Sequence, residues 1–199
     1  MIDEPFRQWL SRSAAAPAHW MHRLGVSPNA VTITATVLGV VAAVVVSQGE
    51  FVFGLAIWLV GRILDGYDGL LARISGRTTL FGGFLDIALD MLAYSAMAVG
   101  FAVAMPADQL LWLFVLVGYV MAITTTLALS SLLERADRTI GGNRSLQFTP
   151  GIAEGGETTV LYSAVALLPM WSRPLLMVWI AVLTLTAIGR LRLAGRLLR

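Results

Sequence analysis

The sequence predicts an all-α integral membrane protein, with six transmembrane helices and an N-terminal amphipathic helix in the membrane interface. Three observations lead to this fold class: the composition, a succession of long apolar segments and the positions of the arginines. Of the 199 residues, 57% are hydrophobic and 13% are charged, and the mean hydropathy is +0.78. These values lie far from those of a soluble globular domain. We expect a single membrane-embedded domain over residues 1–199, with the interfacial helix within 1–26 and the six-helix core over 27–199.

The interfacial helix is expected within residues 3–23. Apolar side chains such as Phe6 and Trp20 are interspersed there with basic ones such as Arg23. This pattern is typical of a helix that lies flat at the surface of a lipid bilayer. Pro17 should bend the helix, because proline removes a backbone hydrogen bond.

The membrane core begins at Ser27, a preferred helix cap, with Pro28 at the first helical position. The segments expected to cross the membrane are 28–47, 51–74, 79–105, 108–133, 157–171 and 174–195. Most of them reach the roughly 20 residues that a bilayer core requires. The fifth is the weakest, because Pro169 and a glycine-rich approach shorten it.

The arginines predict the orientation, since basic residues collect on the cytosolic side of a membrane. One side of the six-span arrangement carries Arg7, Arg12, Arg23, Arg73, Arg77, Arg135, Arg138, Arg144, Arg190, Arg192, Arg196 and Arg199. Only Arg173 falls in a loop on the other side, and Arg62 lies within a span. We therefore expect a multi-pass protein of the cell (cytoplasmic) membrane with both termini in the cytosol. The connection over 134–156 should be cytosolic too.

The composition excludes several kinds of chemistry. The chain has no cysteine and no lysine, which rules out disulfides, thiolate catalysis, a Schiff-base lysine and the lysine of a P-loop. A pI near 9.5 could indicate binding to nucleic acid, but the arginines are scattered at helix ends. We interpret them as topology determinants and phosphate contacts, and we expect no nucleic-acid partner.

Four aspartates lie within the second and third expected spans, although the chain has only 12 acidic residues. They are Asp65, Asp68, Asp86 and Asp90. An ionised carboxylate in hydrocarbon is costly unless it is paired or coordinated. Counted from the turn near residue 76 or 77, all four fall within roughly one helical turn of the same depth, in the cytosolic half of the membrane. The sequence therefore predicts one acidic cluster that needs a cation.

The cluster favours a hard divalent cation. Oxygen ligands without histidine or cysteine select Mg²⁺ or Mn²⁺. Two acidic stripes could hold two ions, an arrangement suited to displacement at phosphorus. Small residues on the same faces, Gly69, Ala72 and Gly82, would let a ligand approach the backbone. Arg73 at the end of the second span would suit a phosphate.

The order of these residues resembles the signature of the CDP-alcohol phosphotransferase (CDP-alcohol phosphatidyltransferase) family. The matching stretch reads Asp65-x2-Asp68-Gly69-x2-Ala72-Arg73-x8-Gly82-x3-Asp86-x3-Asp90, after a Ser-Pro-Asn-x-x-Thr start to the first span. The resemblance implies a phospholipid-synthesis enzyme, commonly a homodimer. Such enzymes join a CDP-linked lipid, usually CDP-diacylglycerol, to a small polar alcohol and release CMP.

The resemblance also implies roles for individual residues. Asp65, Asp68 and Asp86 would be metal ligands, and Asp90 would be both a ligand and the general base. The residues expected to contact the CDP moiety are Gly69, Arg73, Thr79, Gly82 and Asn29.

The acceptor alcohol is left open by these motifs. The segment from Asp86 to Met91 lacks the Asp-Pro-x-x-Asp-Lys pattern of typical phosphatidylglycerophosphate synthases. Three arginines near the expected entry face, Arg135, Arg138 and Arg144, are candidate contacts to an acceptor phosphate. Their alternative role as topology determinants is about as well supported. The segment 154–158 is expected to line the same pocket, with helix capping as its alternative.

Two other functions are compatible with intramembrane aspartates. An Asp-rich prenyltransferase also binds a diphosphate through Mg²⁺, but such enzymes have more spans and lack this register of glycines and arginine. A divalent-cation transporter would distribute its carboxylates along a path. The bunching of the acids at one depth favours a fixed site.

Overall fold

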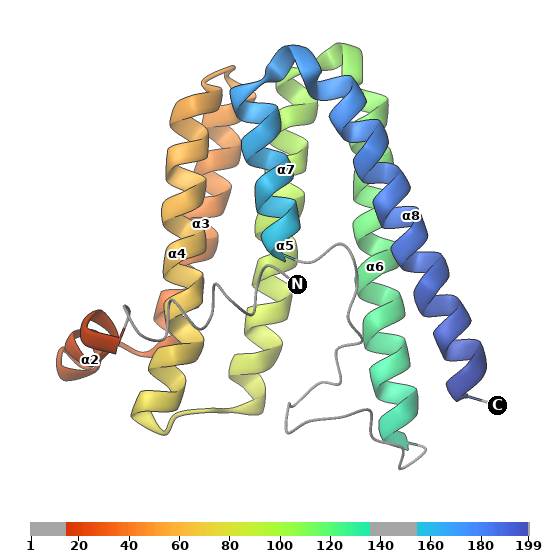
Figure 1. Cartoon of the computed structure of the whole chain (residues 1–199). Helices are drawn as coiled ribbons and strands as arrows, with labels where there is room; N and C mark the ends of the chain where they lie inside the picture. The colour runs from red at the N-terminus through yellow and green to blue at the C-terminus, as the bar shows by residue number, and fades with distance from the viewer. Residues whose placement is uncertain (1–14, 136–154, 199) are drawn as a thin grey trace.

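The computed structural model describes residues 15–135 and 155–198, and it is helical throughout these ranges apart from short connections. Its long helices run side by side as a bundle, and the short helix α2 lies across one end (Figure 1). The helices are α2 Ala15–Arg23, α3 Pro28–Ser47, α4 Phe51–Ser75, α5 Leu80–Ala104, α6 Gln109–Arg135, α7 Gly155–Leu167 and α8 Ser172–Leu197. The single turns η1 Pro106–Asp108 and η2 Pro169–Trp171 precede α6 and α8 at the opposite end.

Four stretches of the described chain are long and apolar enough to cross a membrane. They are Pro28–Ser47, Leu80–Ala104, Pro106–Arg135 and Pro169–Leu197. The other two expected spans differ from these. Helix α4 has the length but carries four charged side chains in its second half, from Arg62 to Arg73. Helix α7 has only 13 residues, less than the roughly 20 that span a bilayer core.

The helix ends follow the local sequence. The Ser27 side chain accepts a hydrogen bond from the Ala30 amide at 3.2 Å, so the expected cap is confirmed. Helix α4 ends at Gly76, whose φ of 65° is left-handed and suits glycine. Thr79 then caps α5 by accepting from the Gly82 amide at 2.9 Å. This short connection makes α4 and α5 antiparallel.

Helices α4 and α5 both pack on α3 more than on each other. Glycines allow α4 and α5 to approach α3 closely. A Cβ added to Gly61 on α4 would lie 3.1 Å from the carbonyl oxygen of Ala35, and one added to Gly39 on α3 would lie 2.9 Å from the Cβ of Ala93 on α5. The two aspartate-bearing helices, α4 and α5, are therefore held in place by packing on α3.

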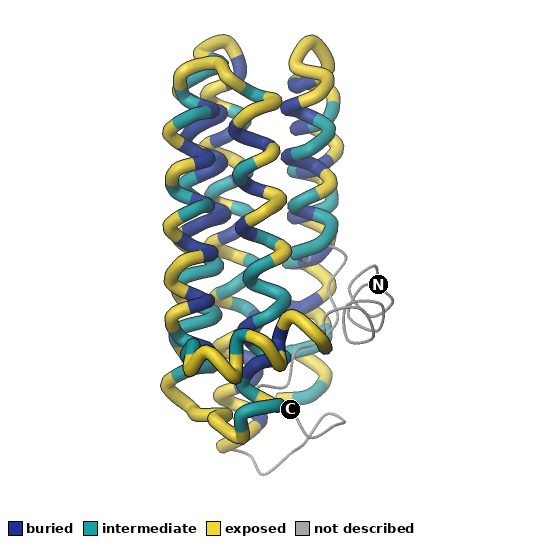
Figure 2. Tube along the Cα trace, turned by 90° about the vertical axis from the view of Figure 1, so that its left-hand side faces the viewer, coloured by how far each residue is buried: buried dark blue, intermediate teal, exposed yellow. Residues whose placement is uncertain are grey.

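The best-packed part of the core lies in the half of the bundle away from the α4–α5 connection. Its largest fully buried side chains are aromatic: Trp58, Trp112, Tyr162 and Phe101. The Phe101 and Trp112 rings stack with centroids 5.0 Å apart. By contrast, the outer faces of the helices are exposed along the bundle (Figure 2), and many of their side chains are large and apolar. Such a surface suits contact with lipid tails.

The N-terminal segment is only partly described. Helix α2 begins at Ala15, so Pro17 lies in its first turn, where proline is tolerated, and it does not bend the described helix. Trp20 is 63% exposed, whereas Ala18 is fully buried. The first part of the expected amphipathic helix, residues 3–14 of 3–23, lies outside the described residues.

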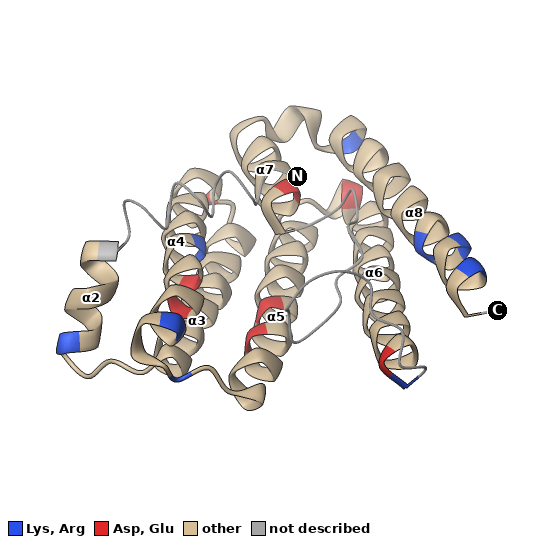
Figure 3. Cartoon of the chain, turned by 60° about the horizontal axis from the view of Figure 1, so that its bottom comes forward, with Lys and Arg blue, Asp and Glu red and all other residues tan. Residues whose placement is uncertain are grey.

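Charge is distributed unevenly along the bundle. Figure 3 shows basic residues on α4, α6 and α8 toward the end that carries the α4–α5 connection. At the opposite end, near the start of α8, the guanidinium of Arg173 pairs with Asp108 at 2.9 Å.

Candidate active site

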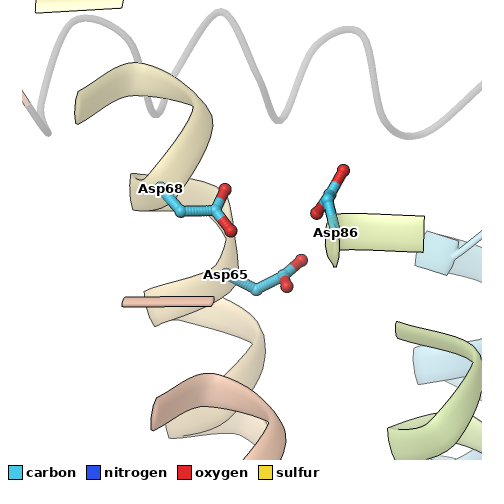
Figure 4. A group of neighbouring side chains, drawn as sticks. All are labelled: Asp65, Asp68 and Asp86. Carbon is cyan, nitrogen blue, oxygen red and sulfur yellow. The ribbon is translucent and has the colours of Figure 1, made fainter. Parts of the chain in front are cut away.

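Three of the four aspartates converge between α4 and α5. Asp65 and Asp68 extend from neighbouring turns of α4 toward Asp86 on α5 (Figure 4). Each offers a carboxylate oxygen, and these three oxygens lie within 4.8 Å of one another. Oxygen ligands lie about 2.1 Å from a Mg²⁺ ion, so that two on opposite sides of it are about 4 Å apart. The spacing and the donor atoms fit a hard divalent cation.

A buried threonine supports one of these carboxylates. The Thr32 hydroxyl, on α3, donates to the Asp68 Oδ2 atom at 2.6 Å, and both residues are buried. Hydrogen bonds to charged groups are among the stronger ones in proteins. The motif at the start of the first span includes Thr32, but a link across 36 positions has no local signal in the sequence.

The fourth aspartate is paired with an arginine. Asp90 Oδ1 accepts a hydrogen bond from Arg62 Nη1 at 2.6 Å, and the same nitrogen lies 3.5 Å from Asp65 Oδ2. Arg62 therefore links Asp90 on α5 to Asp65 on α4. The sequence predicts that Arg62 lies within a span and assigns it no role. Its position three residues before Asp65, on the same face of the helix, was the available signal.

The residues expected to contact CDP lie in two groups beside the acids. In the first, a Cβ added to Gly82 would lie 3.1 Å from Thr79 Oγ1 and 3.3 Å from Asn29 Oδ1. The beginnings of α3 and α5 therefore meet here. In the second, a Cβ added to Gly69 would lie 3.5 Å from Arg73 Nη1. This second group occupies the last turns of α4.

The expected acceptor contacts are only partly described. Arg135 is exposed at the end of α6, whereas Arg138, Arg144 and Glu154 lie outside the described residues. The segment 155–158 begins α7. A Cβ added to Gly155 would lie 2.7 Å from the Tyr94 hydroxyl, so the start of α7 lies beside a tyrosine that contacts Arg62.

This arrangement combines three carboxylates spaced to fit a metal ion, small residues that leave room for a ligand, and an arginine suited to phosphate. Residues 25–188, which include all of these features, match the family model described as CDP-alcohol phosphatidyltransferase. The chain belongs to the CDP-alcohol phosphatidyltransferase family. It is therefore an enzyme that transfers a substituted phosphate group. The prenyltransferase and transporter alternatives are not retained.

Individual relatives agree with the family. The chain is 34% identical over 151 residues to the inner membrane protein YnjF of Escherichia coli K12, a match that covers 74% of this chain and 72% of that protein. It is 38% identical over 104 residues to the phosphatidylinositol phosphate synthase of Streptomyces avermitilis, a match that covers 51% of this chain and 42% of that enzyme.

Solved structures share the fold. The phosphatidylinositol phosphate synthase of Mycobacterium tuberculosis with CDP-DAG bound gives a TM-score of 0.70 at 21% identity, over 90% of this chain and 92% of that one. The same enzyme in complex with manganese and citrate gives a TM-score of 0.68 at 20% identity, over 90% and 88% of the two chains. At 20–21% identity, this structural likeness establishes only that the present chain has the same fold.

Proposed function

We propose that the enzyme transfers a phosphatidyl group from a CDP-linked lipid, CDP-diacylglycerol, to a small polar alcohol and releases CMP. The observation that carries this proposal is the group of three carboxylate oxygens within 4.8 Å of one another. Acidic ligands and small residues lie side by side here. This combination suits a diphosphate that binds together with a metal ion. The CDP-DAG complex of the M. tuberculosis enzyme supports the choice of donor.

The proposed metal ligands are Asp65, Asp68 and Asp86, with Asp90 as a further ligand if two ions bind. Mg²⁺ and Mn²⁺ are the candidates, because only oxygen donors are offered. The manganese complex of the M. tuberculosis enzyme is consistent with either. Bound ions would neutralise the diphosphate and stabilise the charge that develops on departing CMP.

The CDP moiety is proposed to bind over Gly69 and Gly82, where the absence of a side chain lets it approach the backbone. Arg73 would donate to a phosphate oxygen. Asn29 and Thr79 adjoin Gly82 and offer polar atoms to the same ligand. Because Thr79 Oγ1 already accepts from the Gly82 amide, its hydroxyl proton is left free to donate.

Asp90 is proposed to act as the general base. The acceptor hydroxyl oxygen would form a bond to the phosphorus that bears the diacylglycerol, and the bond from that phosphorus to the oxygen of CMP would break. The hydroxyl proton would pass to Asp90. Base catalysis of this kind contributes roughly 10²- to 10⁴-fold to the rate.

The acceptor is proposed to enter past Arg135, Arg138 and Arg144. A phosphorylated polyol would use these arginines, as the likeness to phosphatidylinositol phosphate synthases supports. Alanine at all three positions should raise the KM for such an acceptor at least about tenfold, the effect of losing roughly 1.4 kcal/mol of binding. An unchanged KM would leave these arginines as topology determinants.

The membrane arrangement is also part of the proposal. We propose that residues 1–199 form one domain, that α4 and α7 complete a six-span bundle with the four apolar stretches, and that both termini and the site face the cytosol. The gathering of basic residues at the site's end of the bundle supports this orientation. The inner-membrane relative supports the cell membrane as the location, and a homodimer is proposed.

The central test is a CMP-release assay with purified protein, Mn²⁺, CDP-diacylglycerol and a panel of polar alcohols, including serine, inositol and the phosphates of inositol and glycerol. We expect CMP release that depends on one of the alcohols and is lost with EDTA. If no alcohol supports release, while Mn²⁺ crosses liposomes that contain the protein, the proposed reaction is wrong.

A further inference from the structure

Arg62 is the cation that the structure places among the aspartates. It lies three residues before Asp65 on α4, and its side chain is only 10% exposed. Its Nη1 atom faces three oxygens: Asp90 Oδ1 at 2.6 Å, the Tyr94 hydroxyl at 3.4 Å and Asp65 Oδ2 at 3.5 Å. One nitrogen thus connects the acids of α4 with the innermost acid of α5.

Aromatic rings fix the guanidinium in this place. Its carbon lies 4.8 Å from the centroid of the Trp58 ring and 5.1 Å from that of the Tyr94 ring. Both distances are typical of cation–π contacts. The Tyr94 backbone is itself held, because its carbonyl oxygen accepts from the buried Tyr162 hydroxyl at 2.8 Å. Arg62 is therefore held by the rigid aromatic core on one side and faces the acids on the other.

Stability alone does not account for an arginine at this position. Its Nε and Nη2 atoms are buried and have no hydrogen-bond partner within residues 15–135 and 155–198. Buried polar groups without partners are costly, and a well-packed apolar side chain is often more stable than a buried ion pair. The charged group is better explained by what it does to the acids.

We propose that Arg62 is a positioning residue that holds the Asp90 carboxylate through Oδ1 and acts as a fixed cation beside the metal ligands. A carboxylate held at one oxygen keeps its other oxygen, Oδ2, in a defined place, where it can receive the proton of the acceptor hydroxyl. Misplacement of a catalytic group by about 1 Å costs on the order of 10²-fold in rate. This inference rests on the proposed function of Asp90 as the base.

The fixed positive charge has a second consequence. It lies against Asp65 and Asp90, so it repels a divalent cation that approaches the same carboxylates. The two effects of Arg62 therefore act in opposite directions: it weakens ion binding and speeds the chemical step. A residue that only supported the fold would favour both ion binding and the chemical step.

The test compares Arg62→Met, Asp90→Asn and the double variant with the wild-type enzyme in detergent. Turnover is measured as CMP release, and ion binding as free Mn²⁺ by electron paramagnetic resonance. For Arg62→Met we expect kcat to fall about tenfold to a hundredfold, the KM for CDP-diacylglycerol to stay within about twofold and Mn²⁺ to bind several-fold more tightly. The double variant should be no slower than Asp90→Asn, because the two residues act as one unit.

Three results would overturn the inference: weaker Mn²⁺ binding in Arg62→Met, a rise in KM with an unchanged kcat, or losses of rate that multiply in the double variant. Arg62→Lys covers the case in which Arg62→Met does not fold. It keeps the charge without the planar fork, so Mn²⁺ affinity should stay near the wild-type value while kcat falls. Equal kcat in Arg62→Lys and wild type would also contradict the proposal.

Arg173→Met is the matched control, since it removes an arginine from an ion pair at the other end of the bundle. It should change neither kcat nor Mn²⁺ affinity. The wild-type assay separates the two proposals. If wild type releases CMP, the cycle with Asp90 tests Arg62 directly. If wild type releases none with any acceptor, the proposed function fails, and the Mn²⁺ comparison still decides whether Arg62 is a fixed cation beside the acids.

Discussion

Two groups of acids lie at opposite ends of the described bundle, and their charges are paired to different degrees. At the end away from the site, Asp108 accepts hydrogen bonds from Ser172 Oγ at 2.5 Å and from Arg173 Nε at 2.9 Å, one on each carboxylate oxygen. Arg173 also donates to the Ala107 carbonyl oxygen at 3.0 Å. One acid and its donors thus tie the start of α6 to the start of α8.

The four aspartates of α4 and α5 are arranged differently. Arg62 pairs with two of them, yet three carboxylate oxygens still lie within 4.8 Å of one another. Like charges at such a separation repel unless a cation lies between them. The Asp108 group is complete within the chain and stabilises the fold, whereas the aspartate cluster is the proposed binding site for an ion and the substrate. On this proposal, the same residue types serve structure at one end of the bundle and chemistry at the other.

The largest contrast should come from removing one charge at each end. Asp86→Asn takes one of three anionic ligands from the proposed ion site, so we expect Mn²⁺ binding to be lost and kcat to fall roughly 10³-fold or more, equivalent to several kcal/mol of lost stabilisation. Asp108→Asn is the matched variant. It should lower the apparent Tm but leave kcat per folded molecule and Mn²⁺ affinity unchanged. Retained Mn²⁺ binding in Asp86→Asn would contradict the assignment of the site.

A second change separates ion binding from the chemical step within the aspartate cluster. Asp90→Asn keeps the size of the side chain but removes the base, so kcat should fall roughly 10²- to 10⁴-fold. Binding of Mn²⁺ and of CDP-diacylglycerol should largely survive, because Asp65, Asp68 and Asp86 remain. CMP release and equilibrium binding of the lipid measure the two effects. Near-normal turnover would remove Asp90 from the role of base.

The sequence predicted the parts of this site that depend on local periodicity. Helical spacing put Asp65 and Asp68 on one face, and the short connection after Gly76 brought Asp86 to the same level, as the structure has it. The cap at Ser27 was likewise readable from two neighbouring residues. These features depend on contacts within a few positions along the chain, where residue type and spacing decide the geometry.

The parts of the site that the sequence does not predict depend on packing between helices that are distant along the chain. The links from Thr32 to Asp68 and from Arg62 to Asp90 join positions 36 and 28 residues apart. Nothing in the spacing indicated that α4 and α5 would pack on α3 more than on each other. The approximate span 157–171 also divides into the short α7 and η2, because Pro169 cannot continue a helix beyond Leu167.

A smaller effect is expected from the residue that orients one metal ligand. Thr32→Val removes the donor to Asp68 at nearly constant volume, so Mn²⁺ affinity should weaken about tenfold to a hundredfold, as for other residues that orient metal ligands. Thr36→Val is the control one turn along α3. Its hydroxyl donates to the Thr32 carbonyl oxygen at 3.0 Å and to no aspartate in the described part of the chain. Equal Mn²⁺ affinity in the two variants would mean that the Thr32 hydroxyl does not orient Asp68.

The smallest effect on catalysis should come from Arg173→Met. The Arg173 side chain is 58% exposed, so solvent screens its pairing with Asp108, and its loss should cost only about 1 kcal/mol of stability. Asp108 keeps its bond from Ser172, which limits the damage to a fall of about 2–4 °C in apparent Tm for a chain of this length. Thermal unfolding in detergent and CMP release measure the two quantities. If kcat fell as far as in Arg62→Met, the two ion pairs would not differ in kind, and the separation between a structural and a catalytic end of the bundle would be wrong.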